Sequence, residues 1–185
     1  MDTEEAPFHG AKLLLCHDGA LLTYLRDERP DIPFPAHWDL PGGGREGTED
    51  ARSCALRELT EEFGLTLPPD RVQGRPFPSH QAPGMVSWLF WGNLTAADIA
   101  AIRFGDEGQF WRMMPIADYL AHPRAVPHFQ QWIRSVRDAT GFWPGTTPPD
   151  WLSHSRDPSN INENTRRSLG RQAATSRTTV ASTYK

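Results

Sequence analysis

The chain has 185 residues and a formal net charge of -4, which fits one domain with an appendage and gives no basic excess for binding DNA or RNA. Its two cysteines, Cys16 and Cys54, are too few for a disulfide framework and lack metal-binding spacing, so both are expected to be buried thiols in a reducing compartment. No apolar run approaches the ~18 residues that cross a bilayer, and the acidic N-terminus "MDTEEAPFHG" is unlike a secretory signal, so we expect a cytoplasmic protein that is not in a membrane.

The first half of the chain predicts two strands and a helix. The strands lie in "AKLLLCHDGALLTYLRD" and meet at a His-Asp-Gly turn. Prolines then indicate a surface loop over 28–40, which leads into three glycines. Apolar residues recur at every fourth position from 51 to 63 and predict a helix. Thr48 is the expected N-cap of this helix and Gly64 the expected C-cap.

The second half of the chain mixes strands with shorter helices. The expected elements are a proline-rich connection at 68–83, a strand at 84–94, a short helix or turn at 95–102, a strand at 109–114, a short helix at 115–123 and a last helix at 126–138. Strands mixed with helices predict a layered α/β or α+β domain, although periodicity does not give the order of the strands.

The composition of the chain changes after residue 138. Residues 139–185 are dominated by Ser, Thr, Asn, Arg, Gly and Pro, and few of them can bury apolar surface. Such a composition is typical of disordered segments. We therefore expect a folded domain at 1–138 and a low-complexity, polar, disordered tail at 139–185.

Three glutamates converge on the expected helix at 51–63. At 100° per residue, Glu58 and Glu62 lie almost above one another, and Glu61 flanks them at the border of the apolar stripe. Like charges at this spacing repel by roughly 0.2–0.5 kcal/mol per pair, and a bound cation makes that repulsion tolerable. Carboxylate oxygens suit Mg²⁺ or Mn²⁺, and no Cys/His set suits zinc. Arg57, four residues before Glu61, can offset part of the negative charge.

The glycines Gly42, Gly43 and Gly44 come just before this helix. Glycine permits positive φ and a close approach of the backbone to a ligand. Backbone N–H groups near a helix start can bind phosphate oxygens, and an exposed carbonyl can bind a metal ion. A glycine run alone most often marks a turn, and paired glutamates alone most often face solvent. Loop and helix together predict a metal–diphosphate site.

The spacing of this segment resembles the Nudix box. The pattern of the box is G-x5-E-x7-R-E-U-x-E-E-x-G-U, where U is a bulky apolar residue. The chain matches it at every specified position, with Gly43, then Glu49 after five residues, then "RELTEEFGL" at 57–65 after seven more. The preceding "WDLPGG" also looks like the usual approach to the box. The resemblance covers about residues 12–138. It implies an α/β/α sandwich with a mixed sheet, in which the box forms a loop, a helix and a loop.

The resemblance implies an activity and roles for the box residues. Nudix hydrolases use Mg²⁺, or Mn²⁺, to cleave a nucleoside diphosphate linked to another moiety, with water attacking phosphorus. Carried over by position, Glu58, Glu61 and Glu62 would hold the metal, and Glu58 would deprotonate or orient the water. Glu49 and Arg57 would brace the site as a charge pair.

The resemblance also implies roles for the glycine loop and for a later acidic loop. Gly43, or its neighbour Gly42, would offer a carbonyl to the metal or amides to phosphate. Many family members add one acidic residue from a later loop, and "RFGDEGQFWRM" offers Asp106 and Glu107. We choose Glu107, as a further metal ligand or general base. Members of the family often form dimers, so a homodimer is among the expected assemblies.

The sequence leaves the nucleotide substrate open. Four aromatics, Trp88, Phe90, Trp91 and Phe110, can stack on a base, although alternation in the strand favours core packing for most of them. The markers of particular substrate subfamilies are mostly absent. A nucleoside triphosphate or a related diphosphate is favoured, and hydrolysis of ADP-ribose or a nucleotide sugar is the alternative. A non-catalytic nucleotide sensor is a further alternative, against which the intact glutamates argue.

Overall fold

A six-stranded mixed sheet forms the middle layer of the computed structural model, which describes residues 7–142. The strands are β1 (Phe8–His17), β2 (Ala20–Leu25), β3 (Trp38–Asp39), β4 (Gln73–Pro78), β5 (Val86–Asn93) and β6 (Phe110–Pro115). Their order is β3-β2-β1-β5-β4, and β6 pairs with β2. Strands β1 and β5 are parallel, and the other described pairs are antiparallel.

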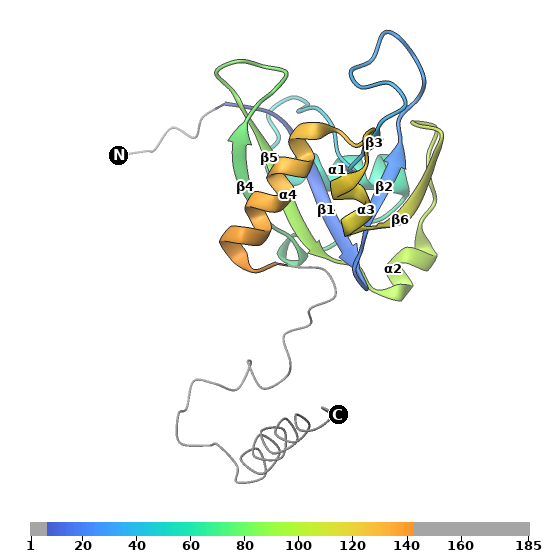
Figure 1. Ribbon diagram of the computed structural model, residues 1–185. Helices are drawn as coiled ribbons and strands as arrows, with labels where there is room; N and C mark the ends of the chain where they lie inside the picture. Colours follow the sequence, from blue (N-terminus) through green and yellow to red (C-terminus); the bar gives the residue numbers. More distant parts are fainter. Residues whose placement is uncertain (1–6, 143–185) are drawn as a thin grey trace, which may run out of the picture. The chain divides into compact units, whose positions relative to one another are not determined.

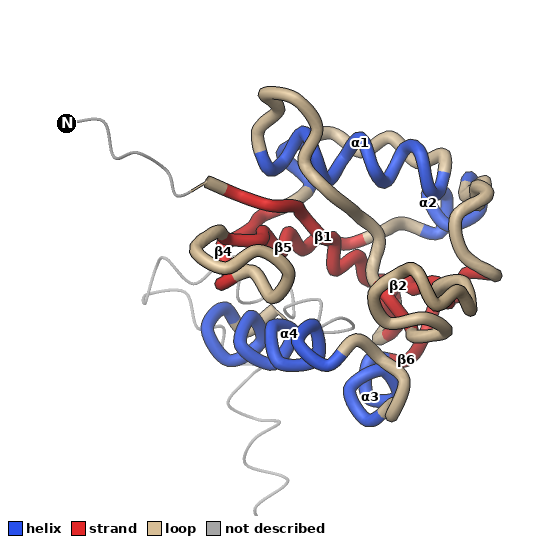
Figure 2. Tube along the Cα trace, turned by 90° about the horizontal axis from the view of Figure 1, so that it is seen from above, coloured by secondary structure: helices blue, strands red, loops and turns tan. Residues whose placement is uncertain are grey.

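Helices cover both faces of this sheet and complete an α/β/α sandwich (Figures 1 and 2). The helices are α1 (Ala51–Phe63), α2 (Ala96–Ala101), α3 (Ile116–Ala121) and α4 (Pro127–Thr140). Helices α1 and α2 lie on one face, and α3 and α4 lie on the other (Figure 2). The predicted fold class is therefore confirmed. Within the described residues, no helix is both long and apolar enough to span a membrane.

Strand β1 supplies apolar side chains to both faces of the sheet. Leu14 and Cys16 belong to the core cluster that includes α3 and α4, whereas Leu13 and Leu15 belong to the cluster beneath α1. Successive side chains of a strand point to opposite faces, so a strand buried on both faces needs an uninterrupted apolar run. This explains why "LLLC" shows no polar alternation.

Helix α1 ends where the sequence predicts but begins later. Gly64 has φ +64° and donates its N–H to the Thr60 carbonyl, so the predicted C-cap is confirmed. The predicted N-cap at Thr48 is wrong, because Asp50 has the extended backbone of an N-cap and its Oδ1 accepts the Ser53 N–H at 2.8 Å. Residues 47 and 48 form a turn before it.

Strand β4 lies inside the segment predicted as a connection. Among the strands of residues 7–142 it pairs with β5 alone, and so it lies at the edge of the described sheet. Proline cannot donate to a ladder, but an edge strand has one side without a partner strand, so Pro76 and Pro78 are tolerated there. Between them, Phe77 points into the core. Proline content predicted a loop because the sequence does not indicate which strand lies at an edge.

The surface loop predicted over 28–40 is wrong at its end, where Trp38–Asp39 form the buried strand β3, whereas most other predicted elements agree with the structure. The turn between β1 and β2, the strands β5 and β6, and the helices α2, α3 and α4 are confirmed. Helix α4 continues to Thr140, past the predicted end of the domain at residue 138. Residues 143–185 of the predicted tail lie outside the described part of the chain.

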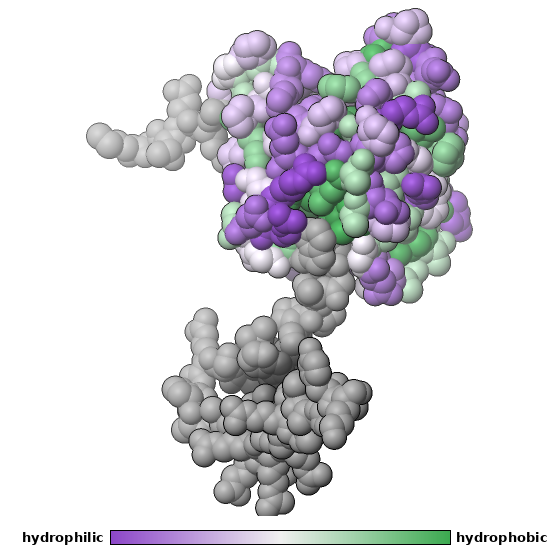
Figure 3. All heavy atoms as spheres, viewed as in Figure 1, coloured by the Kyte–Doolittle hydropathy of each residue, from purple (hydrophilic) through white to green (hydrophobic). Residues whose placement is uncertain are grey.

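Two loops extend beyond the same end of the sheet. One joins β2 to β3 over residues 26–37, and the other joins β4 to β5 over residues 79–85. Figure 1 draws the first in blue and the second in green. Figure 3 shows them as separate projections with a hollow between them. The hollow lies near the N-terminal end of β1 and is the entrance to the site described next.

Candidate active site

The glycine loop is attached to strand β1 by backbone hydrogen bonds. The Ala11 N–H donates to the Gly43 carbonyl at 3.0 Å, and the Leu13 N–H donates to the Pro41 carbonyl at 2.8 Å. The loop is close to β1 at Gly42 and to the Glu58 side chain of α1 at Gly43, so an added Cβ would clash at both positions. A Cβ on Gly42 would lie 2.2 Å from the Ala11 oxygen, and one on Gly43 would lie 2.6 Å from the Glu58 carboxylate. A Cβ on Gly44 would meet nothing within 4 Å.

Replacing Gly42 by Ala is therefore expected to destabilise the fold far more than replacing Gly44 by Ala. Gly42 has φ +119°, and its added Cβ would meet backbone atoms of β1, which cannot move without disturbing the sheet. We expect Gly42→Ala to cost roughly 3 kcal/mol or more and Gly44→Ala to change stability by less than about 1 kcal/mol. Urea unfolding of both variants is the measurement. Equal midpoints would contradict the proposed need for glycine at position 42.

The three box glutamates lie in different surroundings. The Glu58 side chain is 14% exposed and contacts Arg57 at 3.0 Å. Glu62 is buried, and its Oε2 accepts the Gly42 N–H at 2.8 Å. Glu61 is 58% exposed and forms an ion pair with Arg57 at 2.8 Å. The structure thus brings Glu58 and Glu62 to the glycine loop, whereas Glu61 points to solvent.

The burial of Glu58 and Glu62 disfavours their charged forms. Burial raises the pKa of Glu62 to about 8, although the nearby Lys12 ammonium partly opposes this. Burial also raises the pKa of Glu58, against the opposing effect of Arg57. A divalent cation would favour the ionised form of both groups, and carboxylate oxygens are the ligands that Mg²⁺ and Mn²⁺ prefer. The donor chemistry therefore fits a hard cation.

The side chains are not assembled into a finished metal site. Among the described residues, no three His, Cys, Asp or Glu side chains are placed together so that they could hold a metal ion. The Gly43 carbonyl accepts the Ala11 N–H, and the Gly42 carbonyl accepts a hydrogen bond from Lys12. The predicted metal-binding roles of Glu58, Glu61, Glu62 and Gly43 remain predictions.

Arg57 connects helix α1 to the loop before it. Its Nε and Nη2 donate to the two Glu49 carboxylate oxygens at 3.1 and 2.9 Å, and Nη2 also donates to the Gly44 carbonyl at 3.0 Å. The hydrogen bonds from Arg57 lower the pKa of Glu49 to about 2. The Glu46 N–H donates to the same carboxylate at 2.8 Å. Arg57 and Glu49 thus form a pair, and this pair positions Glu58, the neighbour of Arg57.

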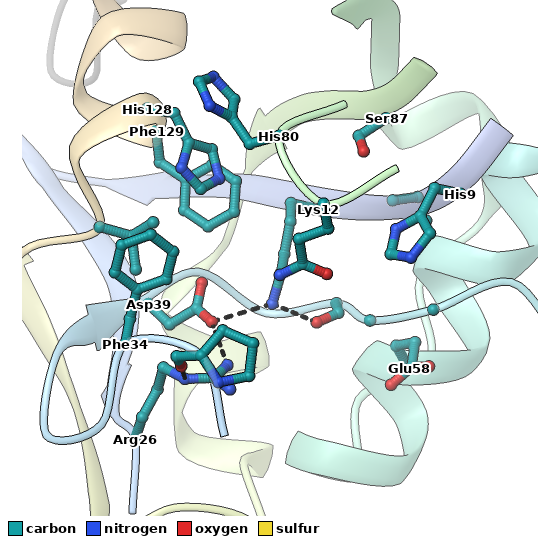
Figure 4. A pocket seen from close by; sticks show the side chains of 18 of the residues that line it. His9, Lys12, Arg26, Phe34, Asp39, Glu58, His80, Ser87, His128 and Phe129 are labelled. Atoms are coloured by element: carbon teal, nitrogen blue, oxygen red, sulfur yellow. Dashed lines mark hydrogen bonds and ion pairs between the residues drawn. The ribbon is translucent and has the colours of Figure 1, made fainter. Parts of the chain in front are cut away.

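A buried charge network that was not predicted from the sequence lies beside the glycine loop (Figure 4). Asp39 is 2% exposed and accepts hydrogen bonds from Arg26 Nη1 at 2.7 Å and from Lys12 Nζ at 3.2 Å. The Leu40 N–H donates to the same carboxylate at 2.6 Å. Lys12 also donates to the carbonyls of Leu40 and Gly42, so it holds the loop against β1. Charged residues inside apolar strand sequences, in "AKLLL" and "WDL", are the signal that indicates such a network.

These groups surround one pocket of about 360 Å³. Glu107 lines it, so the structure brings this residue to the same cavity as Glu58 and Glu62, whereas Asp106 does not line it. His80 lines the pocket and His37 does not.

None of the four aromatics predicted as base-stacking candidates lines the pocket. Phe90 and Trp91 are buried in the core, and Trp88 packs against it. Phe110 is 47% exposed and its ring contacts Trp38. The expectation that core packing is the role of most of them is therefore correct.

Comparisons with known proteins agree on the family and on the fold. A model of the NUDIX domain matches residues 10–136. The RNA pyrophosphohydrolase of Dinoroseobacter shibae is 39% identical over 66 residues, which are 36% of this chain and 40% of that protein. The chain therefore matches less than half the length of this curated relative.

Solved structures resemble the whole described fold. A MutT protein from Methanosarcina mazei superposes with a TM-score of 0.57 and 21% identity, covering 75% of this chain and 99% of that one. The NUDIX domain of Shewanella oneidensis NrtR, complexed with ADP ribose, has a TM-score of 0.54 and 23% identity, covering 75% and 93%. At these identities the likeness shows a shared fold.

Proposed function

The chain belongs to the Nudix family, and on that premise we propose that it is a metal-dependent pyrophosphohydrolase that cleaves a phosphoric anhydride bond of a nucleotide. One observation carries the proposal: a complete Nudix box folds so that Glu58 and Glu62 lie with the glycine loop in the wall of one pocket. The proposed substrate is a nucleoside triphosphate or a related nucleoside diphosphate derivative. We propose a cytoplasmic location and no nucleic-acid polymer as partner.

The charge of the pocket supports a requirement for a divalent cation. Its lining contains four carboxyl groups and two basic side chains, namely Asp39, Glu58, Glu62, Glu107, Lys12 and Arg26. The carboxyl groups that are ionised repel a polyphosphate unless positive charge is added. Glu58, Glu61 and Glu62 would hold Mg²⁺ or Mn²⁺. When bound, the cation would supply charge neutralisation for the diphosphate and Lewis-acid activation.

Glu58 is the proposed group that orients or deprotonates the attacking water. A general base needs a pKa closer to neutrality than an exposed carboxylate has, and burial moves the pKa of Glu58 in that direction. The Arg57 guanidinium, fixed by Glu49, limits the positions that this carboxylate can take. The Gly42 N–H already donates to Glu62, so the N–H groups of Gly43 and Gly44 are the ones proposed to bind phosphate oxygens.

The experiment that tests this function is a panel of nucleotides assayed with Mg²⁺ and with EDTA. The products are separated by anion-exchange chromatography, and phosphate release is also measured with and without an added inorganic pyrophosphatase. The panel contains nucleoside triphosphates, ADP-ribose, a diadenosine polyphosphate and a short 5′-triphosphorylated RNA. Cleavage that needs Mg²⁺ supports the proposal, and the cleaved compound identifies the substrate class. Nucleotide binding without any cleavage would contradict it and favour a sensor.

Replacing Glu107 by Gln is expected to lower kcat on the cleaved substrate by about tenfold or more. The reason is that this carboxylate lines the pocket of Glu58 and Glu62 and adds negative charge where a cation would bind. Asp106→Asn is the matched control, because Asp106 precedes it in the same loop, is exposed and does not line the pocket. If both variants keep the wild-type kcat, Glu107 has no part in the reaction.

A further inference from the structure

Three rings form the wall of the pocket on the side away from Glu58. Phe34 comes from the β2–β3 loop, His80 from the β4–β5 loop and His128 from the first turn of α4. The His80 and His128 rings stack with their centroids 4.3 Å apart and their planes at 21°. The Phe34 centroid lies 5.7 Å from that of His128. We call this set, Phe34, His80 and His128, the ring wall.

The ring wall is anchored in the core at its centre. His128 is 7% exposed, and its ring contacts Phe129 at 4.2 Å and Trp132 at 5.2 Å between centroids. Trp132 in turn stacks on Phe77 of β4 at 4.8 Å. Burial lowers the pKa of His128 to about 4, so this imidazole is neutral at physiological pH. It therefore presents a flat, uncharged surface to the pocket and is a poor partner for a phosphate.

Phe34 is held over the pocket in an unusual backbone conformation. Its φ is +52°, a left-handed value that a bulky residue rarely adopts. The loop is tethered on both sides of this position, by a bond from Arg26 Nε to the Pro33 carbonyl at 2.9 Å and by one from the Ala36 N–H to the Asp27 carbonyl at 3.0 Å. Outlying backbone geometry of this kind is concentrated at ligand sites.

The three rings and the Glu58 carboxylate lie on opposite sides of the cavity. Figure 4 shows Lys12 between Phe34 and His128 on one side and Glu58 on the other. The glycine loop and Glu62 lie with Glu58, the rings lie on the opposite side, and the Asp39–Arg26 pair lies beside Phe34. A nucleotide has the same order of groups, with a charged polyphosphate at one end and a flat base at the other. His80 is exposed and Phe34 is half-buried, so part of each ring can be reached from solvent.

We propose that the ring wall is the nucleobase subsite of the pocket, where the base of the substrate stacks while its phosphates extend toward the glycine loop and Glu58. This inference rests on the proposed function and specifies its substrate as a compound with an aromatic base at one end. Stacking on an aromatic platform tolerates different bases and depends on the area of the base. We therefore expect purine nucleotides to be preferred to pyrimidine nucleotides.

The test compares a nucleotide with a substrate that has no base. Nucleoside triphosphate and inorganic tripolyphosphate are assayed with the wild type, Phe34→Ala and His80→Ala. The ratio of kcat/KM for the nucleotide to kcat/KM for tripolyphosphate is expected to fall about 5- to 150-fold in each variant, mainly through KM for the nucleotide. Phe110→Ala, which removes an exposed ring outside the pocket, is the control and should leave the ratio unchanged.

A conservative variant and a binding measurement complete the test. His80→Phe keeps a flat ring, so it should retain most of the wild-type ratio, and a loss as large as in His80→Ala would overturn the proposal. Calorimetric binding of an α,β-methylene nucleotide is compared with that of methylenediphosphonate, which lacks a base. If the wild type cleaves nothing, the proposed function fails. The subsite would still be supported if the variants bind the nucleotide analogue more weakly than the wild type but bind methylenediphosphonate equally well. Equal losses for both ligands, or no loss for either, would overturn it.

Discussion

Glu58→Gln is expected to lower kcat about 100- to 10,000-fold on any nucleotide that the wild type cleaves. Gln has nearly the same shape as Glu but neither carries the negative charge that binds a cation nor accepts a proton. The carboxylate of Glu58 lies against Gly43 in the pocket and is 14% exposed. Burial already disfavours its charge, so neutralising it should change the free energy of unfolding by only about 1 kcal/mol.

The measurement for this prediction is kcat together with the urea midpoint of the same preparation. Glu46→Gln is the matched control, because Glu46 belongs to the same segment but is 76% exposed and lies 4.0 Å from Arg57. It should keep the wild-type kcat. Calorimetric titration with Mg²⁺ adds a readout that does not need turnover, and Glu58→Gln should bind the ion more weakly. A kcat within tenfold of the wild type would remove Glu58 from the chemistry.

The part of the site that could be predicted from the sequence lies in one contiguous segment. In residues 43–65, the positions of Gly43, Glu58 and Glu62 follow from a loop and a single helix, whose geometry is known once the helix is recognised. The family pattern adds the meaning of that spacing. The spacing does not predict which of the glutamates is buried at the glycine loop. Glu61 forms an exposed ion pair with Arg57, whereas Glu62 accepts a hydrogen bond from Gly42 in the interior.

The rest of the pocket could not be predicted because its residues meet only through the order of the strands. Lys12 and Asp39 lie on β1 and β3, and Phe34, His80 and His128 come from two loops and the last helix. Periodicity predicts which residues of an element are buried, but not which elements are neighbours. The same limit explains the missed strand β4, whose prolines are acceptable only at an edge. Long-range packing therefore determines the half of the pocket that we assign to the base.

Asp39→Ala is expected to cost about 3–5 kcal/mol of stability, because it removes the anion from a buried group of charges. The Asp39 side chain is 3% exposed, and the substitution leaves the Lys12 and Arg26 cations facing each other without it. Urea unfolding at pH 7 measures the loss. Asp31→Ala is the matched control, since Asp31 pairs with Arg29 at 2.5 Å but both side chains are about 60% exposed. Screening by water limits such a pair to about 0–1 kcal/mol.

A second substitution separates the loss of the ion pairs from the cost of the charges left behind. Replacing Lys12 by Met in the Asp39→Ala protein removes one of the two cations that have lost their partner. The double variant is therefore expected to be more stable than Asp39→Ala alone. Lys12 also donates to the Leu40 and Gly42 carbonyls, so Lys12→Met alone should lower kcat by loosening the glycine loop. If Asp39→Ala costs no more than Asp31→Ala, the network does not hold this loop, which would then depend on the hydrogen bonds of the Pro41 and Gly43 carbonyls with β1.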